Sequence, residues 1–310
     1  MTLFVIKRLL FAVPTLLGIA LVTFLLLNAV PGDPALGLVG ERADPQTIAA
    51  IRKELGQDRP LPSRFVGYLS LLAHGNLGRS YYTRREVSKD ILQKFPNTLK
   101  LALAAMLLAT TLGMLLGVMS AVSRGGIMEK VFSGLALAGI SLPVFWVGLV
   151  LMLLFAFWLP LLPPSGMGDG ALIYLALPAA TLGLNSAAYI ARITRMSIVE
   201  ALGAQYVMTA RAKGLSPFVV VGKHALRNAL IPVITLIAID FGSYLNGSVL
   251  TETIFGWDGL GRYALDGIMK RDYPVILGTV LVGSAFFVFF NMIADVAYAY
   301  IDPRIRYGKR

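Results

Sequence analysis

The sequence predicts an all-α integral membrane protein with six transmembrane helices. Hydrophobic residues make up 56% of the 310 residues and charged residues only 15%, whereas roughly 25% of the residues in an ordinary soluble domain are charged. The apolar residues are gathered into long blocks, and a helix needs about 20 mainly apolar residues to cross a membrane. The alternating segments of about ten residues that indicate a transmembrane barrel are not present.

Six blocks are long and apolar enough to span a membrane. They cover residues 9–27, 101–122, 131–159, 172–190, 230–250 and 275–300. The first block exceeds the roughly 7–15 apolar residues of a secretory signal, and no small-residue cleavage site precedes Pro31, so we expect a retained anchor. Pro14, Pro143 and Pro178 fall inside blocks and predict kinks there.

The distribution of basic residues predicts that both termini face the cytoplasm. Lys and Arg number 28 against 17 Asp and Glu, which gives a net charge of +11. If the N-terminus is inside, half of the 28 basic residues lie beside the inner ends of the spans, with only Glu129, Glu200 and Asp302 as acids. The positive-inside rule produces this arrangement. We therefore attribute the basic excess to membrane topology and expect no nucleic-acid partner.

Three segments outside the spans are too long to be simple turns. We expect residues 31–97 to form an extracytoplasmic subdomain with a helix near 45–55, and residues 251–273 to form an outer loop. We expect residues 192–229 to form a loop on the cytoplasmic side. The predicted organisation is the N-terminus with the first helix (1–30), the subdomain (31–97), a five-helix core that contains the cytoplasmic loop (98–300), and a cytoplasmic tail (301–310).

The sequence offers no set of residues for catalysis or metal binding. His74 and His224 are the two histidines and are predicted on opposite sides of the membrane, and cysteine is absent. The zinc-protease H-E-x-x-H motif and the G-x-x-x-x-G-K-[ST] loop that cradles nucleotide phosphates are also missing. We expect no catalytic residue, no metal site and no cofactor in this chain, so that any ATP driving it is bound by another protein.

Four polar residues within the last two spans need an explanation, because charge inside a membrane is costly and by default marks a pathway or a partner. They are Asp240, Asn246, Asn291 and Asp295. Either they line a translocation route, or they hydrogen-bond to neighbouring helices and specify packing. Asp240 and Asp295 would also be the carboxylate dyad of an intramembrane protease, although neither lies in a sequence context typical of one.

The cytoplasmic loop contains the most informative pattern in the chain. Residues 209–215, Thr-Ala-Arg-Ala-Lys-Gly-Leu, are typical of a helix of small residues that ends at a glycine in the left-handed conformation. A basic stretch then re-enters the membrane at Pro232. Such a loop either docks into a cleft of a cytosolic protein or lies on anionic lipid as an interfacial helix.

This loop resembles the coupling loop in the membrane subunits of ATP-binding cassette (ABC) importers, whose pattern is Glu-Ala-Ala, three residues, Gly. Ala210 and Gly214 match the second alanine and the glycine. Met208 and Thr209 replace the glutamate and the first alanine, and the loop is similar to the variant found in the peptide and nickel branch. Further blocks similar to that branch are residues 8–10, 14–16, 31–34, 75–80, 252–255, 259–261, 271–274 and 302–307.

The resemblance covers nearly the whole chain and implies the fold of a type I ABC importer permease. It implies the first permease subunit of a peptide importer, with nickel or glutathione as alternative cargo, in the cytoplasmic membrane of a bacterium or archaeon. The implied partners are a second homologous permease, two cytosolic ABC ATPases and an extracytoplasmic solute-binding protein, besides membrane lipid. Coupling to the ATPases is expected through residues 204–224, with contacts from Ala210, Arg211, Ala212, Lys213, Gly214 and Leu215. A stand-alone channel or secondary transporter is the alternative class.

Overall fold

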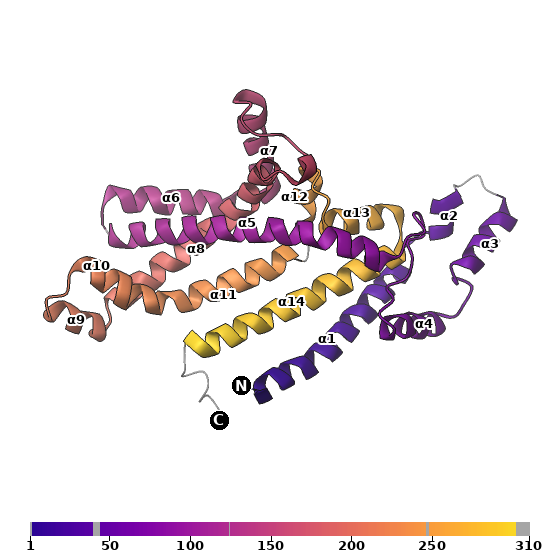
Figure 1. Ribbon diagram of the computed structural model, residues 1–310, viewed down its shortest axis with the longest axis horizontal. Coiled ribbons are helices and arrows are strands. Elements are labelled where there is room, and N and C mark those ends of the chain that lie inside the picture. The colour runs from indigo at the N-terminus through magenta and orange to yellow at the C-terminus, as the bar shows by residue number, and fades with distance from the viewer. Residues whose placement is uncertain (1, 40–43, 124, 246–247, 302–310) are drawn as a thin grey trace. The chain divides into compact units, whose positions relative to one another are not determined.

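The computed structural model describes residues 2–39, 44–123, 125–245 and 248–301, and every regular element within them is a helix (Figure 1). Two segments, Leu153–Trp158 and Val220–Ala225, are π-helical, and Gly168–Gly170 is a single 3₁₀ turn. The α-helices are α1 (Thr2–Ala29), α2 (Pro34–Val39), α3 (Pro45–Glu54), α4 (Leu61–Ala73), α5 (Val87–Val122), α6 (Ile127–Ser141), α7 (Val144–Met152), α8 (Ile173–Leu202), α9 (Gln205–Ala212), α10 (Pro217–Val219), α11 (Leu226–Leu245), α12 (Val249–Ile254), α13 (Leu260–Lys270) and α14 (Tyr273–Ile301).

Six spans can be formed from the helices of the described residues. Four helices, α1, α5, α8 and α14, are each long and apolar enough to cross a membrane. Two bent pairs raise the number to six if each pair is one span: α6 with α7 and its π-helical continuation, and residues 217–225 with 229–245. These six follow the six predicted blocks in order, so the prediction of an all-helical protein with six spans is confirmed.

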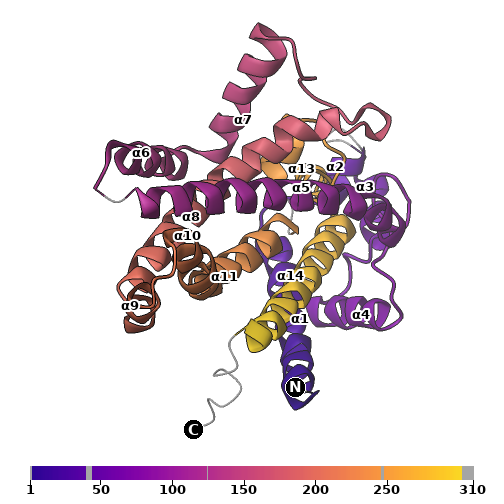
Figure 2. The same ribbon diagram turned by 60° about the vertical axis from the view of Figure 1, so that its left-hand side comes forward.

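The third block is broken at Leu142, directly before Pro143. Leu142 has extended backbone angles (φ −85°, ψ 134°), because the ring of a following proline disfavours the helical conformation. The chain bends by 104° between α6 and α7, and Figure 2 shows α7 turning away from α6. The expected kink at this proline is therefore a complete break, whereas α1 and α8 continue through Pro14 and Pro178.

The described residues within 2–98 and 258–288 form one compact unit. Phe24 of α1 packs against α4, with its ring centroid 5.2 Å from that of Phe65, and Leu277 of α14 joins the same apolar cluster. Asp44 caps the N-terminus of α3 by accepting hydrogen bonds from the backbone N–H groups of the second and third residues beyond it. The helix predicted near residues 45–55 is confirmed by α3.

The described residues within 99–257 and 289–301 form a second compact unit, in which α8 packs against α6, α7 and α11. α8 also lies very close to α5 at two glycines one turn apart. A Cβ atom on Gly113 would lie 2.7 Å from the carbonyl oxygen of Ala187, and one on Gly117 would lie 2.6 Å from Cβ of Thr194. This small-xxx-small spacing lets the two backbones approach, as it does between other membrane helices.

Candidate functional site

The coupling segment predicted over residues 204–224 begins where α8 ends. α8 runs to Leu202, well beyond the predicted end of the span at residue 190, and α9 follows after a two-residue turn. Val207 and Ala210 are buried on one side of α9, where they pack against Val220. The short helix is thus held in place by apolar contacts with the segment that leads into α11.

α9 ends in a Schellman motif at Gly214. The N–H of Leu215 donates to the carbonyl of Ala210 at 3.3 Å, and the N–H of Gly214 donates to the carbonyl of Arg211 at 2.9 Å. Gly214 has a φ of +76°, and no atom lies within 4 Å of the position that a Cβ would take. The left-handed glycine predicted here is confirmed, and it is needed for the backbone conformation and not for a close approach.

The outer side of this segment is an exposed surface of mixed apolar and basic character. Met208 is 58% exposed and Phe218 is 87% exposed, and a cavity of about 430 Å³ lies beside Arg211 and Leu215. Met208 and Phe218 are not among the coupling residues that the sequence indicated. Of the six predicted residues, Arg211, Ala212, Lys213, Gly214 and Leu215 are exposed, whereas Ala210 is buried.

The polar residues predicted in the spans are only partly covered by the described residues. Asn246 and the side chain of Asp295 lie outside them. The distance between the carboxylates of Asp240 and Asp295, the dyad suggested for a protease, is therefore not defined by the described residues. Asn291 lies on α14, is partly buried and interacts with another residue. Asp240 lies on α11, and its Oδ2 atom is buried without a hydrogen-bond partner among the described residues.

Asp240 belongs to a polar cluster between α8 and α11. The hydroxyl groups of Ser186 and Tyr244 are 2.5 Å apart, and Tyr244 donates to the carbonyl of Leu182 at 3.0 Å. Asp240 lies one helical turn before Tyr244 on α11. Because Tyr244 donates its proton to Leu182, Ser186 donates to Tyr244, and Oδ2 of Asp240 is left without a donor among the described residues. Sequence reasoning did not identify Tyr244, whose partners lie about 60 positions away on another helix.

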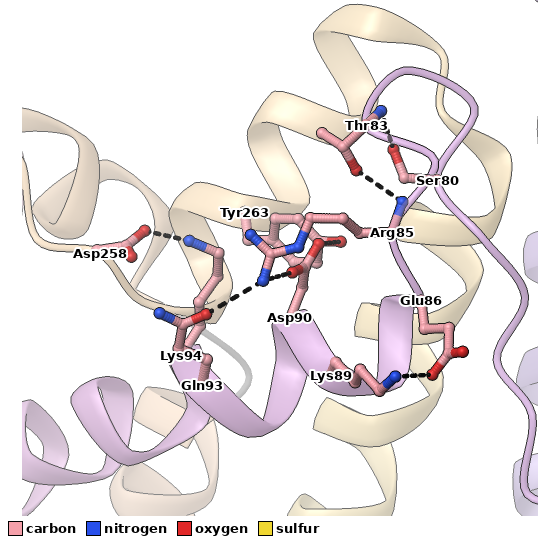
Figure 3. A network of polar contacts seen from close by, with 10 residues as sticks. All are labelled: Ser80, Thr83, Arg85, Glu86, Lys89, Asp90, Gln93, Lys94, Asp258 and Tyr263. Carbon is pink, nitrogen blue, oxygen red and sulfur yellow. Dashed lines mark hydrogen bonds and ion pairs between the residues drawn. The ribbon is translucent and has the colours of Figure 1, made fainter.

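A second polar network lies in the first unit, where the start of α5 meets α13 (Figure 3). Its centre is Asp90, whose side chain is only 7% exposed. Arg85 forms an ion pair with Asp90 at 2.9 Å, and the hydroxyl of Tyr263 donates to its other oxygen at 3.1 Å. Burial, reinforced by the Asp90 charge, raises the pKa of Tyr263 above its usual value, so this phenol stays protonated and can donate.

The same network ties α5 to the turn before α13. Lys94 pairs with the Asp258 carboxylate, and Asn97 donates to the Asp258 carbonyl at 2.8 Å. The hydroxyl of Thr98 accepts the N–H of Leu260 at 2.8 Å, which satisfies one of the unpaired donors at the start of α13. A cavity of about 330 Å³ opens among these side chains, and Lys270 and Asp272 also line it.

Asp272 joins two of the blocks that carry the resemblance. The Ser80 hydroxyl donates to one oxygen of Asp272 at 2.5 Å, and the N–H of Tyr81 donates to the other at 3.1 Å. Burial raises the pKa of Tyr81 to about 12. A Cβ on Gly78 would lie 3.3 Å from Pro274, so the 75–80 block packs directly on the 271–274 block.

Two family models together match nearly the whole chain. Residues 1–102 match the N-terminal membrane component of binding-protein-dependent transport systems. Residues 113–307 match the inner membrane component of the same systems. The residue blocks that carry the resemblance therefore all lie within the regions matched by these two family models.

Full-length relatives agree with the family models. The di/tripeptide transport system permease DppB of Pseudomonas aeruginosa is 42% identical, with 99% of each chain covered. The dipeptide permease DppB of Escherichia coli K12 is 39% identical, again with 99% of each chain covered. The glutathione transport system permease GsiC of Salmonella choleraesuis is 44% identical over 98% of this chain and 99% of that relative.

Solved structures agree on the fold. A chain of the inward-facing MetNI methionine ABC transporter superposes with a TM-score of 0.58 at 19% identity, covering 69% of this chain and 96% of that one. A chain of an amino acid ABC transporter superposes with a TM-score of 0.54 at 19% identity, covering 69% and 94%. These likenesses establish the type I ABC importer permease fold. The chain therefore belongs to the family of inner membrane components of binding-protein-dependent transport systems.

Proposed function

We propose that this membrane-spanning permease carries di- or oligopeptides into the cell as one half of a translocation route, with a second homologous permease as the other half. The observation that carries the proposal is the end-to-end similarity to relatives named as di/tripeptide and dipeptide permeases. A glutathione permease is as similar, and glutathione is itself a small peptide, so it is the second candidate cargo.

The energy would come from two cytosolic ABC ATPases that dock on residues 204–224. The geometry supports this role in two ways. α9 is anchored by the buried Val207 and Ala210, so force applied to its outer side is passed to the packed helices. Met208 on α9 and Phe218 on α10 are exposed in the same segment as basic side chains, and an exposed apolar surface of this kind is typical of a protein contact.

The orientation follows from the positive-inside rule, with both termini and the 192–229 loop in the cytoplasm of a bacterium or archaeon. Residues 31–97 and the 251–273 loop then face the extracytoplasmic solute-binding protein. The Asp90 and Asp258 network would keep the start of α5 and residues 258–263, which both belong to the first unit, in one arrangement, so that the binding protein meets a preformed surface there.

Asp240 and its neighbours support a polar lining for the route, together with Asn246, Asn291 and Asp295. A carboxylate short of hydrogen-bond donors offers a favourable contact to the ammonium group of a passing peptide. ATP binding would close the ATPase pair, push α9 and open the route outward, and hydrolysis would reset it inward. Replacing Asp240 with Asn should reduce peptide uptake while the protein stays in the membrane, and unchanged uptake would remove Asp240 from the route.

The first test is a mild-detergent pull-down of the tagged chain from its native cells, followed by mass spectrometry. Recovery of a second permease and two P-loop ATPases would support the importer. If the chain is recovered alone and drives flux along an ion gradient, the docking role of residues 204–224 is wrong and a channel or secondary transporter takes its place.

The second test identifies the cargo. The purified complex with its binding protein is reconstituted in vesicles, and ATP-dependent uptake of a labelled dipeptide, of glutathione and of Ni²⁺ is compared. We expect dipeptide uptake to be the fastest. Faster uptake of glutathione or Ni²⁺ would reassign the cargo but leave the permease role intact.

A further inference from the structure

A cavity of about 300 Å³ lies between α5, α6 and α8, near the point where α5 ends and α6 begins. It has an apolar wall and a polar end. Its lining includes Phe132, Leu137 and Met196 on the apolar side and Ser120, Arg192 and Arg195 on the polar side. None of these residues belongs to the coupling segment or to the Asp240 cluster.

Two polar groups at this cavity have no partner among the described residues. Ser120 is only 3% exposed, and its hydroxyl makes no hydrogen bond. In contrast, Ser141 and Thr181 donate to the carbonyl four residues earlier in their own helices. The Nε of Arg195 is also buried and unpaired. Buried polar groups in proteins almost always have a partner, so an acceptor from outside the described residues would complete both.

The cavity also carries uncompensated positive charge. Arg195 pairs with Glu129, and the second carboxylate oxygen of Glu129 accepts the N–H of Gly125 at 2.5 Å, so both oxygens of this carboxylate are in use. Arg192 is exposed and has no ion pair or hydrogen bond among the described residues. One guanidinium is therefore left to bind an anion.

We propose that this cavity binds an anionic phospholipid. The phosphate group would accept hydrogen bonds from Ser120, Arg192 and the Nε of Arg195, and the first part of an acyl chain would lie against Phe132, Leu137 and Met196. The ends of α5 and α6 place the polar side at the depth of lipid headgroups, where basic pockets between membrane helices bind such lipids. Free phosphate would satisfy the polar side only, and the apolar wall favours the lipid.

The test uses the purified full-length chain and native mass spectrometry with added phosphatidylglycerol, phosphatidylcholine or inorganic phosphate. We expect retention of phosphatidylglycerol in preference to the other two. Arg192→Gln should weaken that binding about fivefold, the effect of about 1 kcal/mol for one basic residue near an anionic lipid. The matched control is Lys130→Gln, which removes an exposed charge from α6 outside the cavity lining. Equal losses in both variants, or equal retention of phosphatidylcholine, would overturn the proposal.

A labelling experiment separates the lipid from a protein occupant. The chain contains no cysteine, so Ser133→Cys, at an exposed position in the cavity lining, gives a single reactive thiol. Phosphatidylglycerol should slow the reaction of this thiol with a maleimide, and inorganic phosphate should not. If the thiol is protected in the assembled transporter without anionic lipid, the cavity is a protein interface and the lipid assignment is wrong.

Discussion

The Ser80 hydroxyl donates to the buried Asp272 carboxylate at 2.5 Å, across 192 positions of sequence. Asp272 accepts a second hydrogen bond from the N–H of Tyr81. This carboxylate directly follows Arg271, which ends α13 in the left-handed conformation with a φ of 55°. One side chain thus joins the loop before α5 to the turn between α13 and α14, and holds two separate segments of the first unit together.

Replacing Asp272 with Asn should destabilise the protein. The amide keeps the shape but loses the charge, and one of its two positions becomes a donor where the structure needs an acceptor. Hydrogen bonds to charged groups contribute about 1.5–3 kcal/mol each, so we expect a loss of about 2 kcal/mol in the free energy of unfolding. Thermal unfolding in detergent measures the change. Asp266→Asn, an exposed position on α13, is the control and should have little effect. Similar effects of the two substitutions would contradict the role of Asp272.

Replacing Tyr263 with Phe should lower the free energy of unfolding by about 1 kcal/mol near neutral pH, because the ring is kept and one hydrogen bond to Asp90 is lost. The pKa of Tyr263 lies above its usual 10.0 in the folded protein, chiefly through burial. Below pH 10 the phenol is therefore neutral in both the folded and the unfolded state, and its hydrogen bond contributes fully to the free energy of unfolding. Above pH 10 the unfolded state loses the proton first, so the advantage of the native protein over Tyr263→Phe should shrink. Urea unfolding at a series of pH values checks this, and a constant difference up to pH 11 would argue against it.

Replacing Gly214 with Val should uncouple transport from ATP hydrolysis. A side chain has room there, but the φ of +76° is strained for a β-branched residue by about 1–2 kcal/mol. We expect the end of α9 to rearrange while the spans still insert. The measurements are peptide uptake in reconstituted vesicles and the amount of protein in the membrane.

Gly214→Asn is the matched control, since asparagine tolerates the left-handed conformation far better than valine does. It should retain most of the transport. If Gly214→Val transports at the native rate, the assignment of α9 as the coupling element is wrong.

Replacing Gly117 with Ala should destabilise the packing of α5 on α8. The added Cβ would lie 2.6 Å from Thr194 and 2.7 Å from the backbone oxygen of Ala191, and a backbone atom cannot move aside easily. Overpacking of this kind costs about 1–3 kcal/mol. Thermal unfolding gives the size of the effect. The control is Gly134→Ala on α6, where no atom lies within 4 Å, and which should be neutral or slightly stabilising because alanine favours a helix.

The Gly113 and Gly117 pair is a feature that the sequence predicts only in part. The spacing alone permits a close helix contact but does not say which of the other helices is the partner. The structure identifies α8, since Ala187 and Ala191 lie against these two glycines. Tyr244 gave no signal in the sequence, because a tyrosine in an apolar span is ordinary, and only its position beside Ser186 gives it significance.

The sequence by itself determined the class of this protein, the number of its spans and the end of α9 at Gly214. These depend on local properties: the length of an apolar block, the charge beside it, and a backbone conformation that glycine adopts without strain. The tertiary structure alone decided that Ser80 meets Asp272, that Tyr263 meets Asp90, and that Ser120 and Arg192 line one cavity. Such pairs depend on how helices distant in sequence pack together, and packing is a property of the whole folded unit that no local stretch of residues contains.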